Sequence, residues 1–238
     1  MERILKVVMV GAAESGKTSL RNYFLHGNYA WQYTPTANPD FVSTHVTLPS
    51  GELTAVQIWD TSGGAADLLA THSLAEDADG VVLVYDGTSA ASLRALERLL
   101  PPASPAAQRL RRDAVPVVVV QTKADLPPSV RPAQADDLCR ALLGARGAAW
   151  MQASARTGDG VVAVFQAVAD ACTQRLRGVH EPAPGELSPK PRQSRHGDPI
   201  PYHLFEIEGG SATKARRRWT RSPPGRLRHA LRRLLCFA

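Results

Sequence analysis

The sequence predicts an α/β fold in which a six-stranded, mostly parallel sheet is covered by helices on both faces. Short apolar runs alternate with segments of helical periodicity over residues 1–178, a pattern typical of parallel strands joined by helical crossovers. Several of the runs are continuously apolar, as strands buried on both faces are. A length of 238 residues allows one well-buried domain and an appendage.

The predicted strands and helices follow in order along the chain. Residues 5–10 predict a first strand, and the segments at 41–48 and 54–59 flank Pro49-Ser50-Gly51, which predicts a hairpin. Further strands are predicted at 80–85, 115–121 and 148–152, and helices at 17–25, 91–100, 133–143 and 161–177. We expect Pro101, Pro102 and Pro105 to break the helix before them, and the stretch that follows to be a surface insertion.

The composition changes near residue 178, which divides the chain into a domain at residues 1–178 and a tail at residues 179–238. The tail is rich in Pro, Ser, Gly and Arg, so we expect ordered structure to end there. It holds twelve Lys/Arg and five Asp/Glu, an excess of +7, which leaves about −1 of the net +6 for the domain. Such a tail suits an acidic partner, either membrane lipid or nucleic acid, or is a solvated disordered segment.

The cysteines and the apolar runs narrow the class of protein further. Cys139, Cys172 and Cys236 lie far apart and form no CxxC pair, which argues against a disulfide framework or a zinc site and fits a reducing, cytosolic setting. No apolar run approaches the roughly 20 residues that a membrane-spanning helix needs. The run at residues 5–10 is too short to indicate a secretory signal.

A phosphate-binding loop follows the first predicted strand. Gly11 to Thr18 spell GAAESGKT and match GxxxxGK[ST], with a strand before and a helix after, as the motif requires. Gly11 and Gly16 allow backbone conformations that turn successive N–H groups inward, and the helix N-terminus completes an anion site. Lys17 adds a positive charge for the β- and γ-phosphates, and the Thr18 hydroxyl can ligate Mg²⁺.

Three more motifs follow predicted strands. In Asp60-Thr61-Ser62-Gly63, the carboxylate can hold Mg²⁺ through water and the glycine N–H can meet a γ-phosphate. In Thr122-Lys123-Ala124-Asp125, the carboxylate can accept two hydrogens from guanine N1 and its exocyclic amine, a pair that adenine does not supply. In Ser154-Ala155-Arg156, the Ala155 N–H can meet guanine O6. Each motif alone is weak evidence, but four in this order are strong.

With these motifs the sequence resembles the Ras-superfamily small GTPases over roughly residues 4–177. Tyr33-Thr34-Pro35-Thr36 lies where the first switch of that family is found, and Thr36 matches its Mg²⁺-binding threonine. Tyr29 falls at the aromatic position that packs edge-on against guanine. The Rab branch is nearest, because of the Trp59-Asp60 pair, Phe41 and Leu83-Val84-Tyr85-Asp86.

The resemblance implies a P-loop NTPase small G domain that binds GTP or GDP with Mg²⁺ and hydrolyses GTP. It assigns the metal to Thr18, Thr36 and Asp60, and catalysis to Lys17, Thr36 and Gly63. The nucleotide-binding residues that it implies are Gly11, Ala13, Glu14, Ser15, Gly16, Lys17, Thr18, Ser19, Tyr29, Thr36, Asp60, Gly63, Thr122, Lys123, Asp125, Ser154, Ala155 and Arg156.

The resemblance also implies a monomer with protein partners: effectors at the two switches, an exchange factor and an activating protein. Phe41, Trp59 and Leu74 match the aromatic effector triad of Rab proteins, although plain core packing would also explain the first two. Ala37-Asn38-Pro39-Asp40 and the second switch, residues 64–69, depart from the family pattern. We therefore expect partners peculiar to this protein.

The catalytic position departs from the family as well. A Gln that orients the attacking water follows the DxxG glycine in the family, and here that position is Gly64, which has no side chain to do so. Ala13 stands where many relatives have Gly, and bulk there hinders hydrolysis. We expect slow GTP hydrolysis by a vesicle-traffic switch. The alternative is a non-catalytic GTP-binding protein, or a pseudo-GTPase, that serves as an interaction scaffold.

The end of the tail predicts a membrane anchor other than a prenyl group. Cys236 is third from the end, so the ending is not CaaX, although the cysteine can be S-acylated. Apolar residues at 227, 230, 231, 234 and 235 follow helical spacing beside four arginines, which suits an anionic membrane surface on the cytosolic side. A protein-docking helix and an unstructured tail are the alternatives. Nucleic-acid binding is not expected, because no folded binding motif accompanies the arginines.

Overall fold

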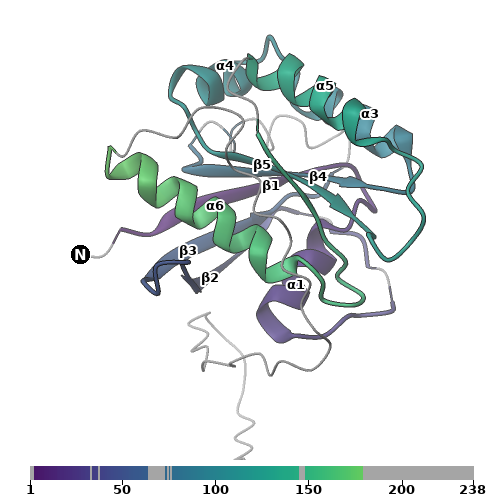
Figure 1. The fold of residues 1–238 in the computed structure, drawn as a ribbon, viewed down its shortest axis with the longest axis horizontal. Coiled ribbons are helices and arrows are strands. Elements are labelled where there is room, and N and C mark those ends of the chain that lie inside the picture. The colour runs from purple at the N-terminus through teal and green to yellow at the C-terminus, as the bar shows by residue number, and fades with distance from the viewer. Residues whose placement is uncertain are drawn as a thin grey trace, which may run out of the picture. The chain divides into compact units, whose positions relative to one another are not determined.

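A computed structural model describes residues 3–32, 34–36, 38–63, 73, 75, 77–144 and 148–178 of the chain. One six-stranded sheet forms its centre, in the order β2-β3-β1-β4-β5-β6, and only β2 runs antiparallel to its neighbour (Figure 1). The strands are β1 (Leu5–Val10), β2 (Asp40–Thr47), β3 (Leu53–Asp60), β4 (Gly80–Asp86), β5 (Val117–Thr122) and β6 (Ala149–Gln152). The predicted fold class is confirmed, with strand ends shifted by one or two residues.

The burial of each strand follows its sequence pattern. β4 and β5 are buried at every position, and both are runs of Val, Leu and similar residues that can face apolar neighbours on either side. β3 alternates between buried and less buried positions, and β2, at the sheet edge, is mostly exposed. In the register of β1, Val8 lies between Trp59 and Val81. The centre of the sheet is thus its most buried part, and the β2–β3 hairpin is its accessible part.

Helices cover the sheet on both faces (Figure 1). α1 (Lys17–His26) and α6 (Val161–Leu176) pack on one face, where the Phe24 and Phe165 ring centroids are 4.3 Å apart. α3 (Ala90–Leu99), α4 (Pro105–Arg112) and α5 (Pro132–Leu143) pack on the other. Each face has its own apolar cluster, so the sheet is the middle layer of three.

Helix α4 corrects the expectation of a surface insertion after the prolines. The prolines do end α3, but Pro105 then opens a new helix, because its missing N–H and fixed φ suit the first helical position. The Ser104 hydroxyl caps this helix by accepting from the Ala107 N–H at 3.2 Å. Ala107 and Leu110 are fully buried against the core. The signal that could have found α4 is the Ser-Pro pair followed by three arginines in the last turn.

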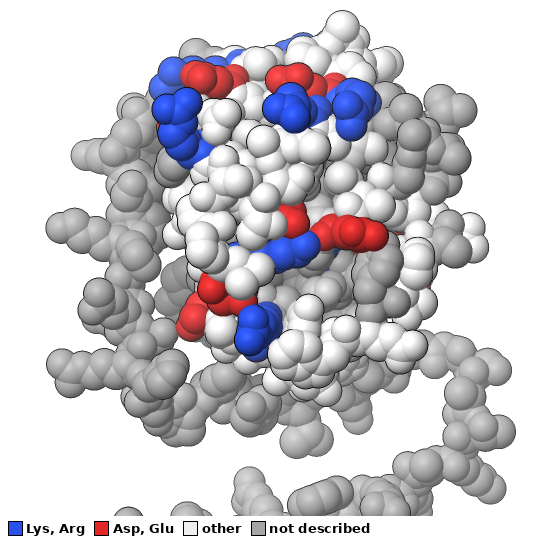
Figure 2. All heavy atoms as spheres, turned by 90° about the vertical axis from the view of Figure 1, so that its right-hand side faces the viewer, with Lys and Arg blue, Asp and Glu red and all other residues white. Residues whose placement is uncertain are grey.

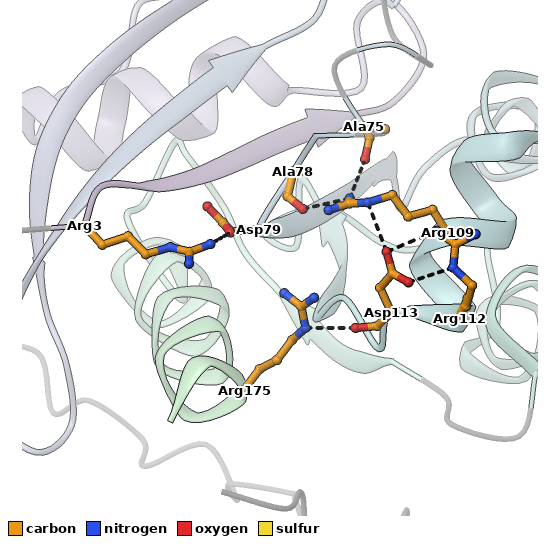
Figure 3. A network of polar contacts seen from close by, with 8 residues as sticks. All are labelled: Arg3, Ala75, Ala78, Asp79, Arg109, Arg112, Asp113 and Arg175. Carbon is orange, nitrogen blue, oxygen red and sulfur yellow. Dashed lines mark hydrogen bonds and ion pairs between the residues drawn. The ribbon is translucent and has the colours of Figure 1, made fainter. Parts of the chain in front are cut away.

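Arg109 joins α4 to the segment that precedes β4 (Figure 3). Arg109 donates to the backbone oxygens of Ala75 and Ala78 at 3.4 and 3.0 Å, just before β4 begins. Its guanidinium also pairs with Asp113 at 3.3 Å. The backbone oxygen of Asp113 accepts from Arg175 of α6 at 2.9 Å. One polar network therefore links α4 both to the residues just before β4 and to α6.

Several sequence predictions fall outside the described residues. These are Tyr33 and Ala37 in the first switch, the second switch at residues 64–69, Leu74, and the whole tail at residues 179–238 with its predicted helix and Cys236. Among the helices that the structure does describe, none is both long and apolar enough to cross a lipid bilayer.

Candidate functional site

The predicted motifs gather at one edge of the sheet, where the parallel strands end. The phosphate loop follows β1, Asp60 closes β3, Thr122 closes β5, and the segment from Ser154 follows β6. In open α/β sheets, ligands bind in the crevice beyond the carboxyl ends of the strands. Figure 2 faces this edge, and acidic and basic side chains lie side by side in the middle of it. The strand order thus brings together motifs that are far apart in the sequence.

The phosphate loop has the backbone that its sequence predicts. Glu14 and Gly16 have φ values of 61° and 94°, in the left-handed region, which turns successive peptide groups around the loop. Gly16 caps α1, and no side chain accepts from the first N–H groups of that helix. The first turn of α1, which includes Ser19, contains no acidic residue. Its unpaired donors and positive dipole end therefore favour an anion.

Lys17 reaches back over the phosphate loop. Its ammonium donates to the backbone oxygens of Gly11 and Ala12, both at 2.9 Å, and the residue is only 4% exposed. Burial lowers the pKa of Lys17 to about 8, and the negative charge of Asp60 opposes that shift. A phosphate beside this buried ammonium would supply the compensating charge that a buried cation needs.

Thr122 holds the loop from the side of the base motif. Its hydroxyl lies 2.5 Å from the Ser15 backbone oxygen and 3.0 Å from that of Tyr85. Gly11 packs so closely against β4 that a Cβ there would collide with the Val84 backbone oxygen. The Ser15 hydroxyl is buried without a hydrogen-bond partner. The loop is therefore fixed against the ends of β4 and β5 by contacts that a larger side chain at Gly11 would disrupt.

Three oxygen-bearing side chains converge next to the loop. The Thr18 hydroxyl donates to the Asp60 carboxylate at 2.6 Å and lies 2.9 Å from the Thr36 hydroxyl. Burial raises the pKa of Asp60, while the hydrogen bond from Thr18 and the nearby cations Arg21 and Lys17 oppose this shift. The other carboxylate oxygen, Oδ1, is buried without a hydrogen-bond partner. Hydroxyl and carboxylate oxygens are the ligands Mg²⁺ prefers, so these residues fit that ion.

Arg21 is a member of this site that the sequence motifs did not predict. Its guanidinium lies 3.8 Å from the Asp60 carboxylate and 3.1 Å from that of Asp40. Its side chain is only 11% exposed. It comes one helical turn after Thr18, on the same side of α1, which is the signal that could have drawn attention to it.

Gly63 lies against the phosphate loop. Its φ is 70°, and a Cβ there would collide with the backbone of Ala12 and Ala13. Its oxygen accepts from the Ala13 N–H at 3.2 Å. The start of the second switch is thus in direct backbone contact with the loop that would hold the phosphates, and a glycine is required at this point.

The residues predicted to bind the base also lie together. The Asp125 carboxylate accepts from the Ser154 hydroxyl at 2.6 Å and lies 3.5 Å from the Arg156 guanidinium. The Lys123 ammonium pairs with Asp86 at 2.6 Å, which links the base motif to the end of β4. Burial by itself would raise the pKa of Asp86. Hydrogen bonds from Lys123 and Thr88 and the positive charge of Lys123 outweigh that effect, so the pKa of Asp86 is lowered. Asp86 is a second supporting residue that the motifs had not assigned.

The aromatic residues on the β2–β3 hairpin form a surface contact. The rings of Phe41 and Trp59 are stacked with their centroids 4.6 Å apart, and the Lys6 ammonium lies 5.3 Å from the Trp59 ring centroid. Phe41 is 47% exposed, which excludes plain core packing for that residue. Trp59 is partly buried against the core, so it supports the ring of Phe41 and also contributes to the exposed surface.

Comparisons with known proteins agree on one family. A model of the Ras family matches residues 6–174. The Ras-related protein Rab7 of Pisum sativum is 31% identical over 171 residues, which cover 70% of this chain and 81% of that protein. The Ras-related protein Rab7 of Drosophila melanogaster is likewise 31% identical, over 70% of this chain and 79% of its own length. The Ypt/Rab-type GTPase YPT7 of Saccharomyces cerevisiae is 36% identical, but over only 38% of this chain and 44% of its own length.

Proposed function

This chain belongs to the Ras family, and from that premise we propose that it is a Rab-like switch that binds GTP and GDP with Mg²⁺ and acts in membrane traffic. The observation that supports this best is the convergence of Thr18, Thr36 and Asp60 beside the phosphate loop. Thr36 precedes the accessible β2–β3 hairpin. A ligand bound to Thr36 would therefore change the conformation of the surface that partners would contact.

The residues of the site would share the work of holding the nucleotide. Lys17 and the N–H groups of the phosphate loop would hold the phosphates, and Thr18, Thr36 and Asp60 would hold Mg²⁺. Bound Mg²⁺ supplies positive charge that offsets the charge of the phosphates. Asp125, fixed by the Ser154 hydroxyl, would accept two hydrogens from guanine, with the base edge against Tyr29. Contacts of Thr36 and Gly63 with the γ-phosphate and Mg²⁺ would order the two switches in the GTP state.

We propose that hydrolysis is slow. Gly64 offers no amide side chain to orient water, and Ala13 adds a methyl group to the loop that contacts Gly63. An activating protein that works through a Gln in that position would have nothing to act on. The switch would therefore spend more of its time in the GTP form. A non-catalytic GTP-binding scaffold is the second candidate, and the same two residues favour it.

Partners are proposed at two places. The exposed Phe41–Trp59 stack would contact effectors, and the basic tail would bind an anionic membrane surface. Exchange and activating proteins would act on the switches. We infer that the protein would act peripherally on the cytosolic face of an intracellular membrane.

Single-turnover GTP hydrolysis by the full chain, with Mg²⁺, tests this proposal. We expect tight GTP binding with slow phosphate release, and we expect Gly64→Gln to speed that release about 10-fold or more, because a misplacement of about 1 Å in a reacting group can cost about 10²-fold in rate. Leu53→Ala is a control, since Leu53 is exposed and begins β3, whereas the site lies beyond the other end of that strand. An ordinary rate in the unchanged protein would refute slow hydrolysis. Failure to bind GTP would refute the switch.

A further inference from the structure

Trp31 is the most exposed large apolar side chain among the described residues, at 79%. It follows α1 by a few residues, on the segment that leads to Thr36. A tryptophan so exposed gains little from burial, so its position rests on specific contacts. Its ring meets that of Tyr29 edge-on, with centroids 5.3 Å apart and planes at 85°. The motifs assign Tyr29 to the base but give Trp31 no part.

The second contact of Trp31 crosses to a distant segment. The Arg156 guanidinium lies over its ring, 5.5 Å from the centroid, which is within the range of a cation–π interaction. Arg156 follows β6, and its guanidinium also lies 3.5 Å from the Asp125 carboxylate. The guanidinium is thus placed between the carboxylate that would read guanine and the ring of Trp31. Its side chain is 53% exposed, so the contact lies at the outer rim of the site.

These contacts join the two segments that border the base. Tyr29 and Trp31 come from the segment after α1, whereas Ser154 and Arg156 come from the segment after β6. Between them stands Asp125, whose carboxylate both Ser154 and Arg156 contact. A base seated on Asp125 with its edge against Tyr29 would have the Trp31–Arg156 contact at its border. Separation of the two segments would require that contact to break.

We propose that the Trp31–Arg156 contact retains the guanine nucleotide by slowing its dissociation. This inference rests on the proposed nucleotide binding and adds a residue that controls the lifetime of the bound state. Such a residue changes how long a switch keeps its nucleotide without touching the phosphates. It also places the point of control beside the first switch, where an exchange factor that displaced Trp31 would open the site.

The test follows release of GDP carrying a fluorescent N-methylanthraniloyl group, from the full chain with Mg²⁺ and excess unlabelled GDP. We expect Trp31→Ala and Arg156→Ala each to speed release about fivefold, since a cation–π contact at an exposed site contributes up to about 1 kcal/mol. Trp31→Phe keeps a ring and Arg156→Lys keeps a cation, so both should fall between. Leu53→Ala, an exposed leucine at the opposite edge of the sheet, should match the unchanged protein.

The double variant separates this role from two independent effects. If the two side chains act through their mutual contact, Trp31→Ala with Arg156→Ala should release GDP about as fast as either single variant. Independent effects would multiply to about 25-fold and would overturn the proposal. Release unchanged in Trp31→Ala would also overturn it and would leave Trp31 as a surface for a protein partner. An unchanged protein that binds no labelled GDP would overturn the proposed function together with this inference.

Discussion

In the proposed nucleotide site, Asp125 is the side chain that would set the choice of base. Its carboxylate offers only acceptors, and the Ser154 hydroxyl, at 2.6 Å, occupies one oxygen and fixes the orientation of the group. The remaining acceptor positions would face the two adjacent donors of guanine in that site. A base without those two donors would leave the acceptor positions that face it without hydrogen bonds.

Asp125→Asn should therefore change the specificity of the site. The amide keeps one acceptor for the base N1 hydrogen but presents a donor where guanine has its amine, whereas xanthine has an oxygen there. We expect GDP affinity to fall about 10- to 100-fold, in line with about 1.5–3 kcal/mol for a hydrogen bond to a charged group, and xanthosine diphosphate to bind more tightly. Equilibrium titration with both nucleotides measures the change.

A second Asp→Asn variant controls for the loss of charge. Asp159→Asn alters a nearby carboxylate that accepts from the Thr157 hydroxyl at 2.7 Å, and it keeps the Asp159 backbone oxygen that accepts from the Ser154 N–H. It should leave the preference for GDP unchanged. If Asp125→Asn also left the preference unchanged, the base would be read by other residues.

At the scale of elements, α4 is the feature that distinguishes this fold from the expected one. It is short and carries three arginines in its last turn, where the helix dipole favours positively charged side chains. Of these, Arg109 reaches out of its own helix to Ala75 and Ala78, in the segment that connects the second switch to β4 (Figure 3). The helix is therefore linked to residues 75 and 78, which lie between the second switch and β4 in the sequence.

Two arginines of α4 allow a matched test of this role. Arg109 and Arg112 both pair with Asp113, at 3.3 and 2.8 Å, but only Arg109 donates to the backbone oxygens before β4. We expect Arg109→Ala to lower the free energy of unfolding by about 1–3 kcal/mol, because it removes the guanidinium that donates to the backbone oxygens of the buried residues Ala75 and Ala78. Arg112→Ala should have no measurable effect. Urea unfolding of both variants measures these free energies. Equal losses of stability would mean that the ion pair with Asp113, and not the bonds to the backbone oxygens, accounts for the effect.

At the scale of the whole molecule, we propose that the chain combines a switch domain with a basic tail. Residues 1–178 carry a formal charge of about −1 and residues 179–238 about +7, so an anionic surface would attract the tail rather than the domain. The apolar spacing at residues 227–235 adds a second source of membrane affinity. Charge and apolar contact together would keep the switch near a membrane in either nucleotide state.

Deletion of residues 223–238 should release the full chain from vesicles that contain anionic lipid. The segment holds four arginines, and each can contribute about 1 kcal/mol near such a surface, so binding should weaken by orders of magnitude. Cosedimentation with anionic and with neutral vesicles measures this. Replacing Leu227, Leu231 and Leu234 by Ala keeps the charge and tests the apolar face alone. Unchanged cosedimentation of the deletion variant would show that the anchor lies elsewhere.

The sequence by itself determined most of the strands and helices in their order along the chain, the motif of the phosphate loop and the motifs predicted to bind the nucleotide base. These features are local, because periodicity and motif spacing act over a few residues. The same local signals failed at residues 105–112, where the prolines suggested an interruption and the structure has a capped helix. The proline signal was right about where α3 ends, but it did not reveal that Pro105 also begins a helix.

Only the tertiary structure decided which distant residues meet. Thr122 holds Ser15 across 107 residues of sequence, Arg21 of α1 lies 3.8 Å from Asp60 at the end of β3, and Arg156 lies over Trp31. None of these contacts follows from spacing, because each depends on the strand order β2-β3-β1-β4-β5-β6, which brings the carboxyl ends of separate strands to one edge. The motifs could indicate the chemistry of the site, but the residues that support and border it are set by how the sheet is assembled.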